Sequence, residues 1–119
     1  DAIEISLRSL NIGPGDEVIT TPMTAFASVL AILRAGATPV LADIDPDTAL
    51  LSIDSARRCL TPKTKAVLLV HLYGHLRNIG NWVTLCNEHN IHLIEDCAQA
   101  HLATSNGKVA GSFGTMGAY

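Results

Sequence analysis

The chain carries little charge, and this excludes one large class of binding proteins. Only 16% of its 119 residues are Asp, Glu, Lys or Arg, and the formal net charge is −3. Nucleic-acid-binding domains usually have a basic surface, so we expect no nucleic-acid partner. Hydrophobic residues make up 48% of the sequence, which is typical of a globular domain rather than of a disordered segment. A chain of this length forms one domain.

Long hydrophobic runs are also missing. No apolar run approaches the roughly 20 residues that a membrane-spanning helix needs. The first residues do not have the charged, apolar and small-residue regions of a signal peptide. We therefore expect no membrane partner and a cytoplasmic location. The sequence begins at Asp1 without Met and turns towards a further strand after Gly114, so we expect it to be a piece of a longer chain.

Cysteine is scarce and widely spaced. Cys59, Cys86 and Cys97 are odd in number and form no C-x-x-C pair, so the sequence indicates neither a disulfide framework nor a zinc site. The acidic turn at residues 43–47 lacks the glycine and the closing glutamate of a calcium-binding loop. We expect reduced thiols and no metal site.

A glycine-rich phosphate loop is missing as well. Neither a G-x-G-x-x-G nor a Walker-type sequence follows any apolar segment. A flavodoxin-like nucleotide or phosphate binder, with four parallel strands in the order second, first, third and fourth, is an alternative that lacks this support.

The sequence does contain a regular alternation of helical and strand-like segments. Helices are predicted at residues 3–10, 25–35, 54–60 and 79–89, and strands at 17–21, 39–42, 66–70 and 91–94. Gly36 is expected to end the second helix and Ser52 to cap the third, and Asn106-Gly107 predicts a turn with short flanking strands. Parallel strands joined by helical crossovers form doubly wound sheets. We therefore predict a single α/β domain over residues 1–119, a three-layer, mainly parallel sheet of about four strands with helices on both faces.

We expect a ligand site at the end of the last predicted strand. The apolar run at 91–94 leads into Glu95 and Asp96 and then into small residues, as at the carboxyl end of a buried parallel strand. Ligands of open α/β sheets bind beyond these ends, so Asp96, Ala98 and Gln99 would face the crevice. Glu95 would point to the opposite face because side chains alternate along a strand, and we interpret it as structural. The alternative for Asp96 is an acid that only caps the next loop.

Three motifs resemble one enzyme family. They are Glu-Asp-Cys-Ala-Gln-Ala-His at 95–101, Gly-Pro-Gly-Asp-Glu-Val at 13–18 and Val-His-Leu-Tyr-Gly at 70–74. In their order along the chain, these motifs resemble those of the DegT/DnrJ/EryC1/StrS sugar-nucleotide aminotransferases. The members of this family are pyridoxal 5'-phosphate (PLP) enzymes of the aspartate-aminotransferase fold. The resemblance covers nearly all 119 residues and implies the central part of the large, cofactor-binding domain. The parent would be a homodimer of amino-sugar biosynthesis that moves an amino group from an amino acid, expected to be glutamate, to a nucleotide-linked keto sugar.

The resemblance also implies which residues bind PLP. The cofactor needs a carboxylate at its ring nitrogen to act as an electron sink, and Asp96 matches that position. Ala98 would pack on one ring face, and Gln99 would lie near the ring hydroxyl. Ala2 matches the end of a motif that binds the cofactor phosphate at a helix N-terminus. Binding of PLP is expected in the parent, and binding by this chain alone is left open.

The resemblance also implies roles for the segment at 22–27 and for His71. In the family an aromatic residue that covers the other ring face directly follows the threonine of the segment at 22–27, whereas here Ala25 follows Thr24 and Phe26 comes one place later. Phe26 therefore either covers the ring or lies in the core. His71 would lie near the substrate, and the alternative is a histidine that is hydrogen-bonded within the structure.

No catalytic residue is expected within these 119 residues. Aminotransferase chemistry needs a Schiff-base lysine beside the cofactor. Lys63 and Lys65 precede the third strand at the far end from the crevice, and Lys108 lies in a turn. In the family this lysine, which some dehydrating relatives replace by histidine, lies a little beyond the position of Tyr119. We therefore expect no turnover by this chain alone, and a non-catalytic α/β binding or dimerisation module is the alternative function.

Overall fold

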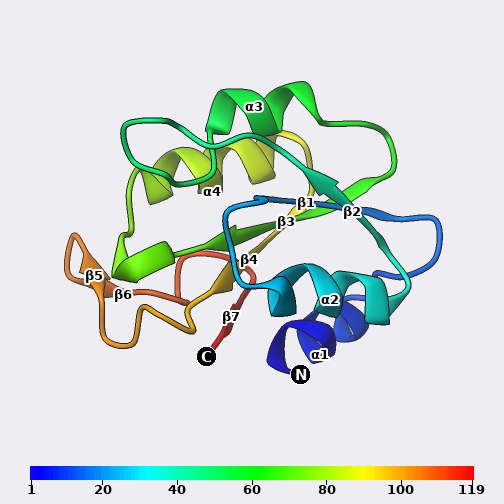
Figure 1. The fold of residues 1–119 in the computed structure, drawn as a ribbon, viewed down its shortest axis with the longest axis horizontal. Coiled ribbons are helices and arrows are strands. Elements are labelled where there is room, and N and C mark those ends of the chain that lie inside the picture. Colours follow the sequence, from blue (N-terminus) through cyan, green and yellow to red (C-terminus); the bar gives the residue numbers. More distant parts are fainter.

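Five parallel strands form the central sheet of the computed structural model, which describes all 119 residues. The strands are β1 (Glu17–Thr20), β2 (Thr38–Leu41), β3 (Thr64–Val70), β4 (His92–Asp96) and β7 (Met116–Ala118), in the spatial order β2-β1-β3-β4-β7. Helices α1 (Ala2–Ser9) and α2 (Phe26–Ala35) cover one face, and α3 (Ile53–Arg58) and α4 (Ile79–Glu88) cover the other (Figure 1). The three-layer α/β fold is therefore confirmed.

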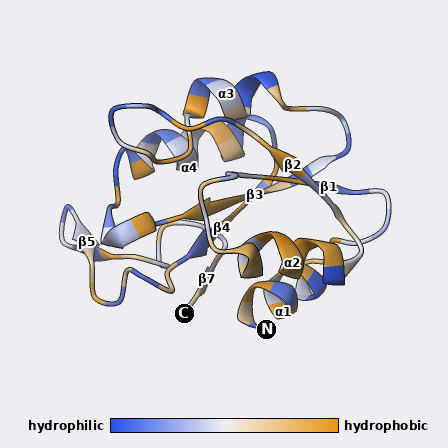
Figure 2. Ribbon diagram, viewed as in Figure 1, coloured by the Kyte–Doolittle hydropathy of each residue, from blue (hydrophilic) through white to orange (hydrophobic).

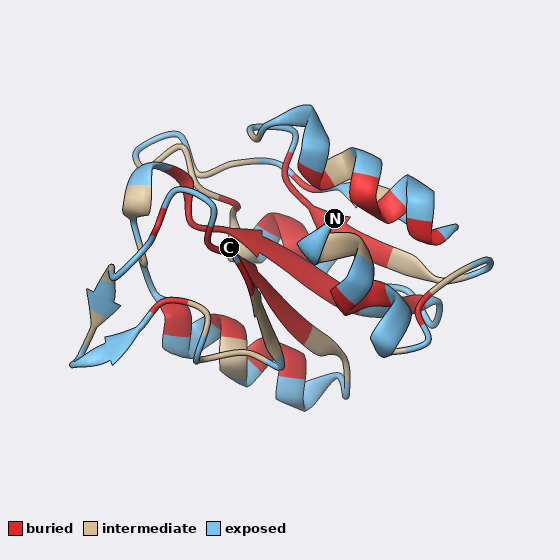
Figure 3. Ribbon diagram, turned by 90° about the horizontal axis from the view of Figure 1, so that it is seen from below, coloured by how far each residue is buried: buried red, intermediate tan, exposed pale blue.

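Strand β3 forms the centre of the sheet because its side chains are apolar on both faces. All its residues except Lys65 are buried, and it pairs with β1 on one side and β4 on the other. Figure 3 shows the buried residues concentrated in the strands and on the helix sides that face them. A strand that is covered on both faces needs such a continuous apolar sequence.

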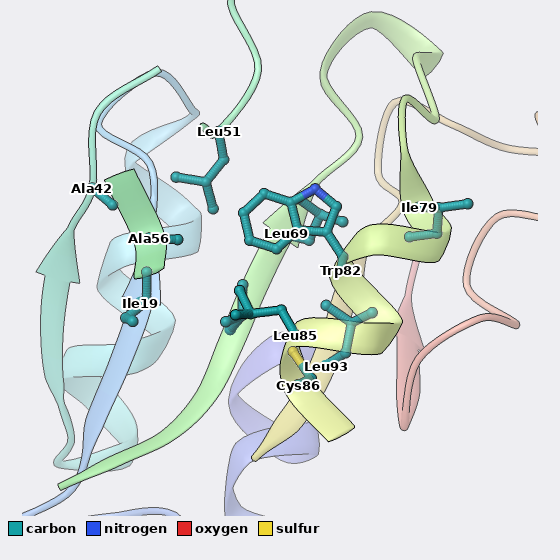
Figure 4. Close-up of a cluster of buried hydrophobic side chains, with 11 residues drawn as sticks. Ile19, Ala42, Leu51, Ala56, Leu69, Ile79, Trp82, Leu85, Cys86 and Leu93 are labelled. Carbon is teal, nitrogen blue, oxygen red and sulfur yellow. The ribbon is translucent and has the colours of Figure 1, made fainter. Parts of the chain in front are cut away.

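Two apolar clusters fill the space between the sheet and the helices. The cluster under α3 and α4 contains 11 buried residues, ten of which are labelled in Figure 4. The cluster under α1 and α2 contains nine. Consecutive residues of β4 alternate between them, with Leu93 in the first cluster and Ile94 in the second. This alternation decides the direction of the two acids that follow.

The helix end, the helix cap and the turn predicted from single residues are all present in the structure. Gly36 ends α2 with a left-handed φ of 89°, and the Ser52 hydroxyl caps α3 by accepting a hydrogen bond from the Ser55 N–H at 3.3 Å. Asn106 and Gly107 have φ values of 51° and 76° and connect β5 (Thr104–Ser105) to β6 (Lys108–Val109). Positive φ at both central residues is the geometry of a tight hairpin turn.

The sheet differs from the prediction at its edge and in its strand lengths. Strand β7 is a fifth strand, and it pairs with the last three residues of β4. Strands β3 and β4 are longer than predicted, so that Glu95 and Asp96 belong to the ladder. A 3-10 turn, η1 (Leu72–Gly74), follows β3. None of the helices has both the length and the apolar character needed to cross a lipid bilayer.

Candidate functional site

Asp96 is held at the carboxyl end of β4 on the face covered by α1 and α2. Its side chain is 7% exposed. The hydroxyl of Ser28, on α2, donates to Asp96 Oδ2 at 2.8 Å, and the Ala98 N–H donates to Oδ1 at 3.2 Å. Each carboxylate oxygen therefore has one donor and keeps a lone pair for a further one. Asp96 does bond the loop that follows it, but its stronger contact is to a helix 68 residues away in sequence.

Glu95 points to the opposite face and is completely buried. His71 Nε2 lies 2.8 Å from Glu95 Oε2, which also accepts the Gly111 N–H at 2.9 Å. The N–H groups of Phe113 and Gly114 donate to Oε1, each at 2.7 Å. Because an ionised carboxylate only accepts, His71 must carry a proton on Nε2. Glu95 thus joins the ends of β3 and β4 to the loop at 111–114, which is the structural role predicted for it.

The hydrogen bonds to Glu95 determine its charge state. Burial by itself raises the pKa of this carboxyl group, but the bonds from His71 and from the three backbone N–H groups outweigh burial. The result is a pKa below the ordinary value of 4.5. Glu95 is therefore a buried carboxylate at neutral pH, stabilised by the four donors that reach its two oxygens.

A cavity of about 140 Å³ lies beside Asp96. It is bounded by the first residues of α1, one side of α2, the ends of β4 and β7, and Tyr119. Three of the residues predicted to bind a cofactor line it: Ala2, Asp96 and Ala98. Ala27, Ala31 and Ala118 add small apolar walls. The structure therefore brings the buried carboxylate of Asp96, several methyl groups and the amino end of a helix, with the exposed Asp1, to the same cavity.

The other predicted residues lie outside the lining of this cavity. Ala25 is the N-cap of α2, and Phe26, the first residue of α2, is 69% exposed and therefore not part of the core. His71 is only 2% exposed and is bonded to Glu95; it borders a separate cavity of about 110 Å³ with His75 and Arg77 on the other face. The predicted ring-covering and substrate-binding roles of these residues stay predictions.

Gln99 is oriented by the turn after β3. Its Oε1 accepts the Tyr73 N–H at 2.9 Å. Tyr73 and Gly74 both have positive φ, at 55° and 80°, and a Cβ on Gly74 would approach the carbonyl oxygen of Gln99 to 3.3 Å. Because a backbone N–H can bond only to the amide oxygen, the free end of Gln99 is its NH₂ group, which is a donor. Gln99 would therefore present a donor to a ligand.

None of the three lysines lines the cavity. Lys63 and Lys65 lie at the amino end of β3, and the Nζ of Lys108, on β6, lies 4.9 Å from the centre of the Phe113 ring. The expectation that no lysine here acts as a nucleophile stays a prediction.

His71, Glu95 and Cys97 place three metal-ligating atoms within 4.8 Å of one another. The chemistry of this group favours hydrogen bonding over metal binding. Both oxygens of Glu95 already accept two donors each. Burial, with smaller contributions from Glu95 and Asp96, raises the pKa of the Cys97 thiol to about 12, so the thiol is protonated at neutral pH.

Sequence reasoning missed Ser28. It is 3% exposed, and its Oγ lies 2.9 Å from the hydroxyl of Thr24 as well as bonding Asp96. The available signal was a pair of hydroxyl residues four positions apart, the first just before α2 and the second in its first turn. The identity of their partner on β4 depended on the packing of α2 against the sheet.

Comparison with known proteins identifies relatives of the whole chain. The model of the DegT/DnrJ/EryC1/StrS aminotransferase family matches residues 1–119. The chain is 44% identical over 119 residues to UDP-N-acetyl-3-dehydro-alpha-D-glucosamine 3-aminotransferase of Acidithiobacillus ferrooxidans, covering 100% of this chain and 32% of the relative.

Solved structures also resemble this chain over most of its length. The X-ray structure of an aminotransferase from Psychrobacter cryohalolentis matches with a TM-score of 0.94 and 44% identity, over 98% of this chain and 29% of that one. NtdA from Bacillus subtilis, with bound cofactor PMP, matches with a TM-score of 0.85 and 36% identity, over 92% and 25%. The chain thus spans about a third or less of the length of the relatives it matches. On this sequence and structural evidence, the chain belongs to the DegT/DnrJ/EryC1/StrS aminotransferase family.

Proposed function

We propose that this chain forms the central part of the PLP-binding domain of an aminotransferase that acts on a nucleotide-linked keto sugar, with glutamate as the amino donor. The observation that carries the proposal is the position of Asp96, Ala2 and Ala98 on one cavity. The substrate class rests on the relative from Acidithiobacillus ferrooxidans, whose name describes a UDP-linked keto sugar. Membership of a homodimer and a cytoplasmic location belong to the same proposal.

The residues around the cavity fit a pyridoxal cofactor chemically. A protonated pyridine nitrogen needs an acceptor, and each oxygen of Asp96 keeps a free lone pair. A flat ring needs small apolar walls, which Ala27, Ala98 and Ala118 supply. A phosphate needs free N–H groups, and the amino end of α1, beginning at Ala2, offers them together with the positive end of the helix dipole.

Each predicted residue has a distinct role in this proposal. When bound, PLP supplies an electron sink for the substrate carbanion. Asp96 holds the proton on the ring nitrogen, and Ala98 packs against the ring. The NH₂ group of Gln99 donates to the ring oxygen. Phe26, at the start of α2, covers the other ring face from its exposed position.

The remaining roles concern the phosphate, the substrate and turnover. Ala2 contributes to the phosphate site, and Ala25 lies beside the ring at the N-cap of α2. His71 acts near the substrate. We propose no turnover by this chain alone, because none of its lysines lines the cavity.

The experiment is a calorimetric titration of the purified chain with pyridoxamine phosphate. This form of the cofactor carries an amine and so does not condense with surface lysines. Replacing Asp96 by Asn removes one charge-assisted hydrogen bond, typically about 1.5–3 kcal/mol, so we expect affinity to fall roughly 10- to 100-fold. Asp47→Asn makes the same change at an exposed position in the turn after β2 and should leave affinity unchanged.

The comparison of the Asp96→Asn and Asp47→Asn variants tests whether the cavity binds the cofactor. Saturable binding that Asp96→Asn weakens and Asp47→Asn does not supports a cofactor site. Absence of binding at millimolar ligand, or equal affinity in the Asp96 variant, would overturn the proposal.

A non-catalytic dimerisation module is the second candidate. One observation favours it: α1 and α2 expose apolar side chains away from the sheet, including Ile5 at 65% and Leu33 at 49%. Figure 2 shows that α2 is hydrophobic over most of its length. An exposed apolar patch of this kind often marks an interface. Sedimentation at several concentrations would detect self-association, and replacement of Leu33 by Glu should abolish it.

A further inference from the structure

Thr24, Ser28 and Asp96 form a continuous hydrogen-bonded chain that connects two distant parts of the sequence. The hydroxyl oxygens of Thr24 and Ser28 are 2.9 Å apart, and the Ser28 hydroxyl lies 2.8 Å from Asp96 Oδ2. Ser28 is 3% exposed and Asp96 is 7% exposed, so water competes little for the second bond. Neither hydroxyl residue lines the 140 Å³ cavity. The hydrogen bonds of Thr24 and Ser28 therefore reach the cavity through Asp96.

The direction of each proton in this chain follows from elementary chemistry. A carboxylate can only accept, so the proton of the Ser28 hydroxyl points at Asp96. A hydroxyl has a single proton, so the Ser28 oxygen must accept from Thr24. Both donors therefore point the same way, towards the carboxylate, and bonds aligned in this manner strengthen one another. The second donor to Asp96, the Ala98 N–H, is more distant at 3.2 Å.

We propose that Thr24 and Ser28 are positioning residues that fix the rotamer of Asp96 so that its carboxylate faces the cavity. The proposal deepens the proposed cofactor site and rests on it for its functional meaning. Without the Ser28 hydroxyl, Oδ2 has no donor in a nearly dry site, and the carboxylate is free to rotate towards other partners. The cavity would then lose the buried carboxylate that a protonated ring nitrogen needs.

The same chain couples the loop before α2 to the cavity. Thr24 directly precedes Ala25 and Phe26, the residues proposed to lie beside the cofactor ring. A movement of that loop therefore changes the donor that reaches Ser28, and through it the support of Asp96. Loop position and carboxylate orientation are set together.

The test begins on the purified chain without ligand. Three-bond NMR couplings report the χ1 angle of Asp96, and we expect values of a single rotamer in the wild type and averaged values in Ser28→Ala. Ser28→Thr retains a hydroxyl and should restore the single rotamer. Unchanged couplings in Ser28→Ala, or averaging in both Ser28 variants, would overturn the proposal. This readout does not depend on cofactor binding, so it can fail or succeed separately from the proposed function.

Affinity for pyridoxamine phosphate provides the second readout. Ser28→Ala should weaken binding roughly tenfold, because a hydrogen bond to the charged group that contacts the ligand is lost. Thr24→Val should weaken it about threefold, since its hydroxyl acts one bond further away, whereas Thr24→Ser should bind like the wild type.

In the double variant Thr24→Val, Ser28→Ala we expect no loss beyond that of Ser28→Ala, because the relay is already broken. Additive losses would show two independent contributions and contradict the relay. Thr24 is only half-buried, so Thr24→Val provides a folded test even where Ser28→Ala does not fold.

Discussion

Replacement of Glu95 by Gln tests whether one buried carboxylate fastens the carboxyl ends of β3 and β4 to the loop at 111–114. The four donors that reach Glu95 come from His71 on one side and from residues 111–114 on the other. Glutamine has almost the same shape but keeps only one acceptor oxygen. If that oxygen faces Phe113 and Gly114, the NH₂ group faces two other donors. The packing is unchanged, and only the hydrogen bonding is lost.

The expected loss follows from counting donors. A buried donor left without an acceptor costs about 1–3 kcal/mol, so two such donors cost roughly 2–6 kcal/mol. His71 can reduce this by moving its proton to Nδ1 and accepting from the new NH₂ group, which leaves only the Gly111 N–H unpaired and lowers the loss to about 1–3 kcal/mol. Domains of this size are stable by only about 5–15 kcal/mol, so either value is large.

Urea denaturation, followed by the fluorescence of Trp82, which is 3% exposed in the folded chain, measures the loss. Glu88→Gln is the matched control, because Glu88 is exposed and its ion pair with Arg57 is long at 3.7 Å. That variant should change stability by less than about 1 kcal/mol. If the Glu95 and Glu88 variants have the same free energy of unfolding, the Glu95 carboxylate does not fasten the strand ends to this loop, and its proposed structural role is wrong.

The remaining predictions concern pH, packing and thiol reactivity. The pKa of folded Glu95 lies below the ordinary value of 4.5, so its carboxylate stabilises the fold above about pH 4.5. This stabilisation is lost as the pH falls through the lower pKa of the folded state. Urea denaturation at several pH values should therefore show that the free energy of unfolding falls more steeply in acid for the wild type than for Glu95→Gln. Gly114→Ala should destabilise by about 1–3 kcal/mol because its Cβ would overlap a carbonyl oxygen of β4, whereas Gly80→Ala, where no atom lies within 4 Å, should be neutral or stabilising in the same assay. Burial raises the pKa of Cys86 and of Cys97 to about 12, so a thiol reagent at pH 8 should modify one of the three cysteines in the folded chain and all three only after unfolding.

The parts of the fold that sequence predicted are those fixed by near neighbours. Gly36 ends α2 and Ser52 caps the start of α3, each through contacts within four residues. The Asn106-Gly107 turn depends on the two residues themselves. The apolar run of β3 indicated its central position without any knowledge of its partners. Strand alternation correctly placed Glu95 and Asp96 on opposite faces, because that rule needs only the strand itself.

What sequence did not predict depends on contacts between distant segments. The relay to Asp96 joins residues 68 positions apart, and the donors to Glu95 lie up to 24 positions away. The cavity wall contributed by Ala118 and Tyr119 exists only because β7 pairs with β4. Phe26 was ambiguous between core and cofactor site because a residue at the first turn of a helix can point either way, and its exposure was decided by how α2 lies on the sheet.

The opposed directions of Glu95 and Asp96 have a consequence for changes in gene length. One codon gained or lost ahead of Glu95 within β4 would shift the strand by one place and exchange the two faces. An insertion would bring the longer acid to Ser28 and leave no acid beside His71, whereas a deletion would bring the shorter acid beside His71 and leave none at Ser28, so in neither case would both sets of donors be satisfied. We expect this short stretch to reject insertions and deletions of single residues, while the exposed turn at Asn106-Gly107 accepts them.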